Sequence, residues 1–134
     1  MIVVVTNVIF YRWMASPLSR AAERAWLKDP DWIAPMLWRS EFRSALAGAL
    51  RHKLITADAA IDIIERAETQ FVGREFLVSS REVIRLVASS RCSAYDCEFV
   101  TLAREQGVPL LTVDRQVLRD FAEIAISLNK FVRP

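Results

Sequence analysis

Hydrophobic and polar positions along the chain fall into blocks with two different periods. Consecutive apolar residues, many of them β-branched, are typical of strands that are buried on both faces of a sheet. Such runs predict strands at 1–5, 31–34, 76–78, 109–113 and 124–128. Apolar residues at helical spacing predict helices at 6–14, 18–28, 35–53, 56–71, 80–88, 93–106 and 115–121. Because strands and helices alternate, the pattern predicts an α/β fold with a mostly parallel sheet flanked by helices.

Single polar residues, prolines and glycines mark where the predicted helices begin and end. Thr56 and Ser93 stand just before helical patterns, where a hydroxyl can cap the first turn. Gly107 follows the helix that begins near Ser93, in the position where a left-handed residue often ends a helix. Pro35 is predicted to lie in the first turn of the helix that contains Trp38, because proline is favoured there.

The length and composition indicate one globular domain. The chain has 134 residues, and we predict a single domain over 1–134. Apolar residues make up 53% of the sequence and the mean hydropathy is +0.20, so some apolar surface is expected to meet a partner. No apolar run reaches the ~18 residues that span a membrane. The apolar start lacks the basic leader and cleavage site of a signal peptide, so we predict that it is a buried strand.

Several kinds of site are excluded or disfavoured by residue counts. The sequence holds three glycines, which excludes a glycine-rich phosphate loop of the P-loop or dinucleotide type. Cys92 and Cys97 have the spacing of neither a zinc site nor a redox motif, so we expect reduced thiols in a cytoplasmic protein. The lone His52 lies near a helix end, where it complements the helix dipole. The net charge of +2 does not by itself indicate a nucleic-acid binder.

Three acidic residues lie at positions that are consistent with a functional site. Glu41 is in the apolar stripe of its helix, three residues after Trp38, and a buried carboxylate needs a partner, a proton or a metal. Asp96 lies in the first turn of the helix that follows Ser93. Asp114 directly follows the predicted strand at 109–113.

The predicted elements place Asp96 and Asp114 at the same edge of the sheet. The helix over 93–106 is about 21 Å long, and it leads through a short turn into a strand that runs back about 16 Å. That edge is the carboxyl end of the parallel strands, where open α/β sheets bind ligands. Several carboxylates facing one another suit Mg²⁺ or Mn²⁺.

Each acid also has a structural explanation. Asp96 fits a role in capping its helix and complementing the helix dipole. Asp114 fits a turn or an N-cap, and Glu41 fits an ion pair with Arg39 or Arg43. Together, at one sheet edge, the three favour a metal site.

The sequence resembles the PIN-domain ribonucleases, in particular the VapC-type toxins of bacterial toxin–antitoxin pairs. The resemblance covers nearly the whole chain. The motifs that carry it are, in order, Met1-Ile-Val-Val-Val-Thr-Asn-Val-Ile, Trp38-Arg-Ser-Glu41-Phe, Ser93-Ala-Tyr-Asp96-Cys-Glu-Phe-Val and Leu111-Thr-Val-Asp114. Each motif is weak alone, but the order and spacing of all four are specific.

The resemblance implies a PIN-like, Rossmann-like fold and a metal-dependent endoribonuclease. It implies that Glu41, Asp96 and Asp114 are the catalytic residues and the ligands of Mg²⁺ or Mn²⁺. Asn7 and Thr112 would orient these acids from a second shell. The metal would generate hydroxide from water and stabilise charge on the cleaved phosphate. RNA would be the substrate, and the partners would be a second copy in a homodimer and a small cognate antitoxin.

One position departs from the family pattern. The family's first acid falls on Val5, which cannot ligate a metal, although Thr6 and Asn7 keep the frame of the motif. A natural loss and an engineered change that removes toxicity would both leave this sequence. We therefore expect the ribonuclease to be impaired in this form.

Aromatic residues near the start provide a candidate surface for the antitoxin. Trp13 and Trp26 lie on the first two predicted helices, with Phe10, Tyr11 and Leu27 nearby. Core packing accounts for some of them. The excess of apolar residues nevertheless suggests a groove for an amphipathic segment of the antitoxin.

Two other functions compete with the toxin hypothesis. The first is a naturally inactive PIN scaffold that acts as a protein- or RNA-binding module. The second is a phosphoacceptor receiver domain, which also gathers acids at a sheet edge. A receiver needs paired acids after its first strand and a lysine after a later one, whereas this chain has Thr6, Asn7 and Arg115 there.

Overall fold

The computed structural model describes residues 1–134 and is built around one parallel sheet. Its strands are β1 (Ile2–Val4), β2 (Trp32–Pro35), β3 (Glu75–Phe76), β4 (Leu110–Thr112) and β5 (Ala125–Ser127). The strand order is β3-β2-β1-β4-β5, and every neighbouring pair is parallel. All five strands therefore end at the same edge of the sheet, which confirms the predicted α/β architecture.

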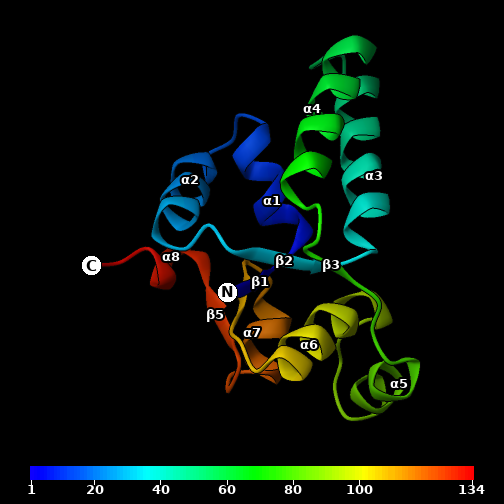
Figure 1. Ribbon diagram of the computed structural model, residues 1–134, viewed down its shortest axis with the longest axis vertical. Helices are drawn as coiled ribbons and strands as arrows, with labels where there is room; N and C mark the ends of the chain where they lie inside the picture. The colour runs from blue at the N-terminus through cyan, green and yellow to red at the C-terminus, as the bar shows by residue number, and fades with distance from the viewer.

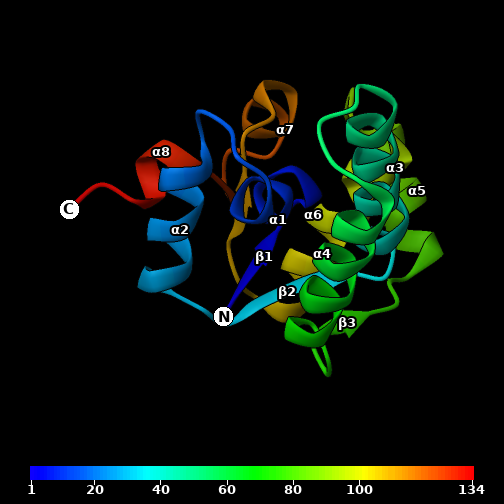
Figure 2. The ribbon, with the colours of Figure 1, turned by 90° about the horizontal axis from the view of Figure 1, so that it is seen from above.

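Helices cover both faces of the sheet. They are α1 (Thr6–Trp13), α2 (Ser19–Lys28), α3 (Trp38–Arg51), α4 (Ala57–Gln70), α5 (Ser80–Ala88), α6 (Ala94–Gln106), α7 (Arg115–Asp120) and α8 (Leu128–Phe131). Figure 1 shows α1 to α4 on one side of the sheet and α5, α6 and α7 on the other. Seen from above, α2 and α8 lie at one end and the pair of α3 and α4 at the other, with α1 between them (Figure 2). None of the helices combines the length and the apolar character needed to cross a membrane.

The core is one continuous cluster in which β1, β2 and β4 are completely buried. Burial on both faces explains why these strands consist of unbroken apolar runs. Aromatic side chains fill the space between sheet and helices. Trp26 packs edge-to-face on Trp32 with ring centroids 5.2 Å apart, and Phe10 packs on Phe42 at 5.6 Å. Core packing therefore explains Trp26 and Phe10, whereas Leu27 is 74% exposed.

Most predicted helix ends are confirmed, and one prediction is wrong. The hydroxyls of Thr56 and Ser93 accept hydrogen bonds from backbone N–H groups in the first turns of α4 and α6. Gly107 ends α6 in the left-handed conformation. Pro35, however, is the last residue of β2 and pairs with Phe76 of β3, and α3 begins only at Trp38. Proline has no backbone N–H, but the pairing of β2 with β3 does not require one at Pro35. The N–H of the next residue, Met36, donates to the Phe76 carbonyl.

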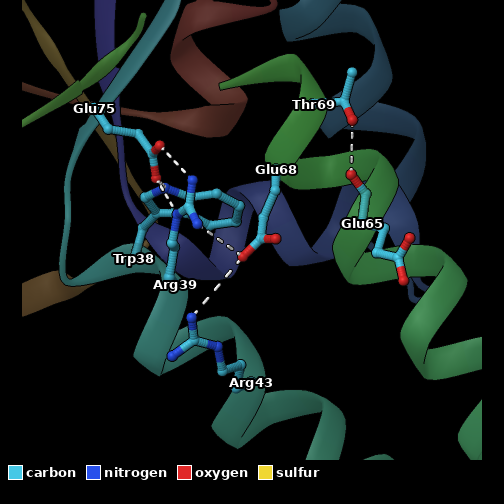
Figure 3. A network of polar contacts seen from close by, with 7 residues as sticks. All are labelled: Trp38, Arg39, Arg43, Glu65, Glu68, Thr69 and Glu75. Atoms are coloured by element: carbon cyan, nitrogen blue, oxygen red, sulfur yellow. Dashed lines mark hydrogen bonds and ion pairs between the residues drawn. The ribbon is translucent and has the colours of Figure 1, made fainter. Parts of the chain in front are cut away.

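An ion-pair network fixes the start of α3 to β3 and α4 (Figure 3). Arg39 donates to both carboxylate oxygens of Glu75, at 2.6 and 2.7 Å, and the indole N–H of Trp38 donates to the same carboxylate at 2.7 Å. Arg39 also pairs with Glu68 at 3.2 Å. These bonds hold the pKa of Glu75 below its usual range, chiefly through the hydrogen bonds from Arg39. The first turn of α3, which carries Glu41, is thereby anchored.

Candidate functional site

A small cavity lies at the carboxyl ends of β1 and β4, the two central strands. It has a volume of about 70 Å³. Its walls are formed by Val5, Thr6, Asn7, Glu41, Asp96, Phe99, Thr112, Val113 and Asp114. The structure thus brings together all the site residues that were predicted from the sequence, including the position of the missing acid.

Val5 and Asp114 have similar local roles on neighbouring strands. Val5 directly follows β1 and Asp114 comes two residues after β4, and each forms the N-cap of the next helix, Val5 for α1 and Asp114 for α7. The backbone N–H of Val5 donates to the carbonyl of Leu111 at 3.1 Å, which ties the two strand ends together. Asp114 caps its helix by accepting from the N–H of Val117 at 2.9 Å, whereas Val5 provides no side-chain cap. An acid at position 5 would therefore share the cavity with Asp114 and lie at the positive end of α1.

Glu41 projects from the first turn of α3 toward the start of α1. The buried hydroxyl of Thr6 donates to its carboxylate at 2.6 Å. Burial raises the pKa of Glu41; the hydrogen bond from Thr6 opposes this rise, and the charge of Asp96 adds to it. The alternative that Glu41 pairs with Arg39 or Arg43 is wrong, because both arginines pair with acids of α4 and β3.

Asp96 lies in the first turn of α6, and its backbone N–H donates to the Ser93 hydroxyl at 3.0 Å. Burial is also the main cause that raises the pKa of Asp96. The hydrogen bond with Ser93 lowers it, and the charge of Asp114 raises it. The charges of Glu41, Asp96 and Asp114 therefore act on one another across the cavity.

The two residues predicted to orient the acids take different positions. Thr112 is fully buried, and its hydroxyl accepts from the backbone N–H of Asp114 at 3.1 Å. Asn7 lines the cavity and is exposed. Thr6 was not among the predicted site residues, although its hydroxyl is the direct hydrogen-bond partner of Glu41. Its signal was a hydroxyl residue in the first helical turn after β1, at the edge where the acids gather.

The donors suit a divalent cation in kind but not in number. Carboxylate and hydroxyl oxygens are ligands that Mg²⁺ and Mn²⁺ favour. As the side chains lie, no three acids, histidines or cysteines come close enough to hold one ion. Val5, which lines the same cavity, contributes no oxygen ligand. The three acids would therefore hold a divalent ion only weakly in this chain.

Comparison with solved structures supports the fold. The structure is similar to PAE2754 from Pyrobaculum aerophilum, with a TM-score of 0.77 and 20% identity over 98% of this chain and 85% of that one. It is similar to FitAcB from Neisseria gonorrhoeae, with a TM-score of 0.71 and 20% identity over 95% and 96% of the two chains. It is also similar to FitAB bound to an IR36 DNA fragment, with a TM-score of 0.70 and 18% identity over 96% and 95%.

Comparison with known sequences identifies the family. No curated protein matches the chain. The sequence profile of the PIN domain matches residues 2–125, a stretch that contains every strand of the sheet up to the start of β5 and all the residues that line the cavity. PIN domains are generally nucleases, and they generally use divalent metal ions. This match over most of the chain, together with the strand order and the acids at the carboxyl edge, shows that the chain belongs to the PIN domain family.

Proposed function

We propose that this protein is a toxin-type, Mg²⁺- or Mn²⁺-dependent endoribonuclease of a toxin–antitoxin system, impaired in this form by Val5. The observation that carries the proposal is the cavity that Glu41, Asp96 and Asp114 share with Val5. Three acids are present and the fourth position of the family pattern is apolar. The frame of a nuclease site is thus retained while one ligand side chain is missing.

The chain's own residues account for how the site would treat an RNA strand. Thr6 holds the Glu41 carboxylate in place, and Ser93 and Thr112 fix the backbone at Asp96 and Asp114. The N-termini of α1, α6 and α7 meet near the cavity, so their N–H groups favour negative charge there. A divalent ion, when bound, supplies an activated water and neutralises phosphate charge. Val5 contributes no oxygen to hold such an ion.

The toxin assignment and the antitoxin rest on the resemblance to VapC-type proteins, and the proposed cytoplasmic location rests on the two free cysteines. Leu27 on α2 and the half-buried Trp13 on α1 remain candidates for an antitoxin surface. A naturally inactive PIN scaffold is the second candidate function, and it is favoured by the absence of any three-ligand group. The two functions differ in one result: restoring an acid at position 5 yields a nuclease only if the remaining site is intact.

The acids themselves provide the direct test of the proposed site. In a Val5→Asp background, Asp96→Asn and Asp114→Asn should each abolish RNA cleavage, because each removes charge from the cavity. Asp62→Asn is a matched control, since Asp62 is exposed on α4 and pairs with Arg66 of the same helix. Cleavage that survives both cavity variants would contradict the proposed site.

We expect the protein to form a symmetric homodimer, as the resemblance implies, because closed two-fold pairing is the commonest way to bury exposed apolar surface in identical chains. Exposed apolar side chains include Leu54 and Val72, which are 70% and 73% exposed. Light scattering at several protein concentrations measures the mass directly. A strict monomer at all of them would contradict the dimer.

We expect the chain with Val5 to melt higher than Val5→Asp in EDTA at neutral pH. The new carboxylate would face Glu41, Asp96 and Asp114, and like charges at close range are costly. The substitution would also remove the packing of the Val5 side chain against the core. These losses exceed the gain of about 1 kcal/mol from capping α1, so the melting point should fall by about 4 °C.

A neutral variant and added metal separate the contributions to this difference. Val5→Asn caps α1 without a charge, so it should melt above Val5→Asp in EDTA. Added Mg²⁺ should raise the melting point of Val5→Asp more than that of Val5→Asn, since only native-state binding stabilises. Equal shifts for the two variants would show that position 5 is not part of a carboxylate metal site.

A further inference from the structure

A second hollow lies beside the acidic cavity along the same edge of the sheet. It has a volume of about 240 Å³ and is lined by Met36, Phe76, Leu77, Val78, Ser80, Val83, Ile84 and Glu98. Met36 directly follows β2, and Phe76 ends β3. The acidic cavity lies at the ends of β1 and β4, so the strand order puts the two hollows next to each other.

Helix α6 connects the two hollows. Its first turns place Asp96 and Phe99 in the acidic cavity and Glu98 in the second hollow. A strand of nucleic acid whose phosphate lies at the acids therefore has a neighbouring nucleotide within reach of the second hollow. The hollow is continuous with the candidate site and not a remote feature of the surface.

The walls of this hollow combine apolar surface with a single acidic group. Leu77, Ile84 and Met36 are 86%, 64% and 40% exposed, which is unusual for large apolar side chains. Glu98 is half-buried among them and has no hydrogen-bond or ion-pair partner in the protein. A purely apolar occupant would leave that carboxylate without a donor, which is costly. The hollow thus suits a flat apolar group that carries N–H donors at its edge.

We propose that this hollow binds an unpaired guanine base of the RNA, a proposal that rests on the ribonuclease function proposed above. Unpaired bases are recognised by stacking on side chains and by hydrogen bonds to their Watson–Crick edges. Guanine presents a ring N–H and an amino group side by side on that edge, and these can donate to both oxygens of Glu98. Adenine, cytosine and uracil each present only one such donor group.

The negative charge of Glu98 makes the hollow discriminate between bases. A carboxylate repels the phosphates of RNA, so it disfavours every strand whose base does not donate to it. Arg81, which follows the lining residue Ser80 in α5, is exposed and has no ion-pair partner in the protein. It can hold the phosphate of the bound nucleotide while Glu98 reads the base.

Binding can be measured with the protein as it is, because the impaired site leaves the RNA intact. Fluorescence anisotropy would compare labelled single-stranded oligouridine with the same strand carrying one guanine, in Mg²⁺ buffer. We expect the guanine strand to bind about tenfold more tightly, the scale of one two-bond base contact. Inosine, which lacks the amino group, should bind with intermediate affinity.

Two variants locate the effect at the hollow. Glu98→Gln should remove the preference for guanine. Glu105→Gln, an exposed position on the same helix that lines a different hollow, should keep it. Equal affinity for all strands, no RNA binding at all, or a preference that survives Glu98→Gln would overturn the proposal. So would a dimer that Leu77→Asp dissociates, because a second copy would then fill the hollow.

Cleavage separates this proposal from the function on which it rests. If Val5→Asp cuts RNA and Val5→Asp with Glu98→Gln cuts at the same sites with no change in the bases beside them, the hollow is not a base site while the ribonuclease stands. If Val5→Asp does not cut but guanine binding depends on Glu98, the ribonuclease is wrong and the base site is retained.

Discussion

Val5→Asp is expected to cut single-stranded RNA at least about 100-fold faster than the chain with Val5, the scale for one electrostatic stabiliser in an active site. The new carboxylate would follow β1 as Asp114 follows the neighbouring β4. It would add oxygen ligands to the acidic cavity, where no three-ligand group now exists. Rates would be measured on labelled RNA with Mg²⁺, with Mn²⁺ and with EDTA.

The choice of control decides what this gain means. Val5→Asn restores a polar cap at the same position without a charge, so it should remain close to the activity of Val5. Equal cleavage by Val5→Asp and Val5→Asn would mean that polarity alone matters. Equal cleavage by Val5→Asp and the unchanged chain would remove position 5 from the site and favour the binding-module function.

Arg39→Met is expected to lower the free energy of unfolding by about 2 kcal/mol at neutral pH, the scale for hydrogen bonds to a charged group that is left poorly paired. Glu75 has a side chain only 10% exposed, and Arg39 provides two of its three hydrogen bonds. Denaturant unfolding of the two proteins measures the difference. Arg43→Met is the matched control, because Arg43 is 59% exposed and its ion pair spans 3.9 Å, so a loss under about 0.5 kcal/mol is expected.

The same difference should depend on pH in a fixed direction. Arg39 keeps the pKa of Glu75 below that of an ordinary glutamate. A carboxylate with a lowered pKa stabilises the fold above its unfolded pKa, and this contribution is lost as the pH falls through the folded value. The gap between the protein and Arg39→Met should therefore close in acid. A gap that stays constant down to acid pH would show that Arg39 acts through packing alone.

Local signals in the sequence were sufficient for most of the fold. The unbroken apolar runs predicted β1, β2 and β4, because burial on both faces allows no polar alternation. The edge strands β3 and β5 are only half-buried, and of the strand predicted at 76–78 only Phe76 lies in β3. Ser93 and Gly107 marked the two ends of α6, since a cap and a left-handed residue leave clear signatures. The prediction for Pro35 was wrong, because the pairing of β2 with β3 overrides the local preference of proline for a first helical turn. The short α8 after β5 was not predicted.

The candidate site was predictable where chain direction alone fixed position. Asp96 and Asp114 could be placed at one edge, because α6 and β4 run in opposite directions. The partner of Glu41 could not be found in this way. Arg39 and Arg43 are close to Glu41 in sequence, but its partner is Thr6. This pairing results from the packing of α1 on α3, a tertiary contact between distant segments. The second hollow, at Met36 and Glu98, likewise depends on packing that the sequence pattern does not contain.

The position of β4 between β1 and β5 has a consequence for the order in which a ribosome makes this protein. β1 leaves the ribosome well before its neighbour β4, because β4 and the acid at Asp114 follow only after more than a hundred residues. Until then one side of β1 is an open, fully apolar strand edge, the kind that recruits foreign strands. A nascent chain thus lacks the acidic cavity until Asp114 has been made and β4 can join β1.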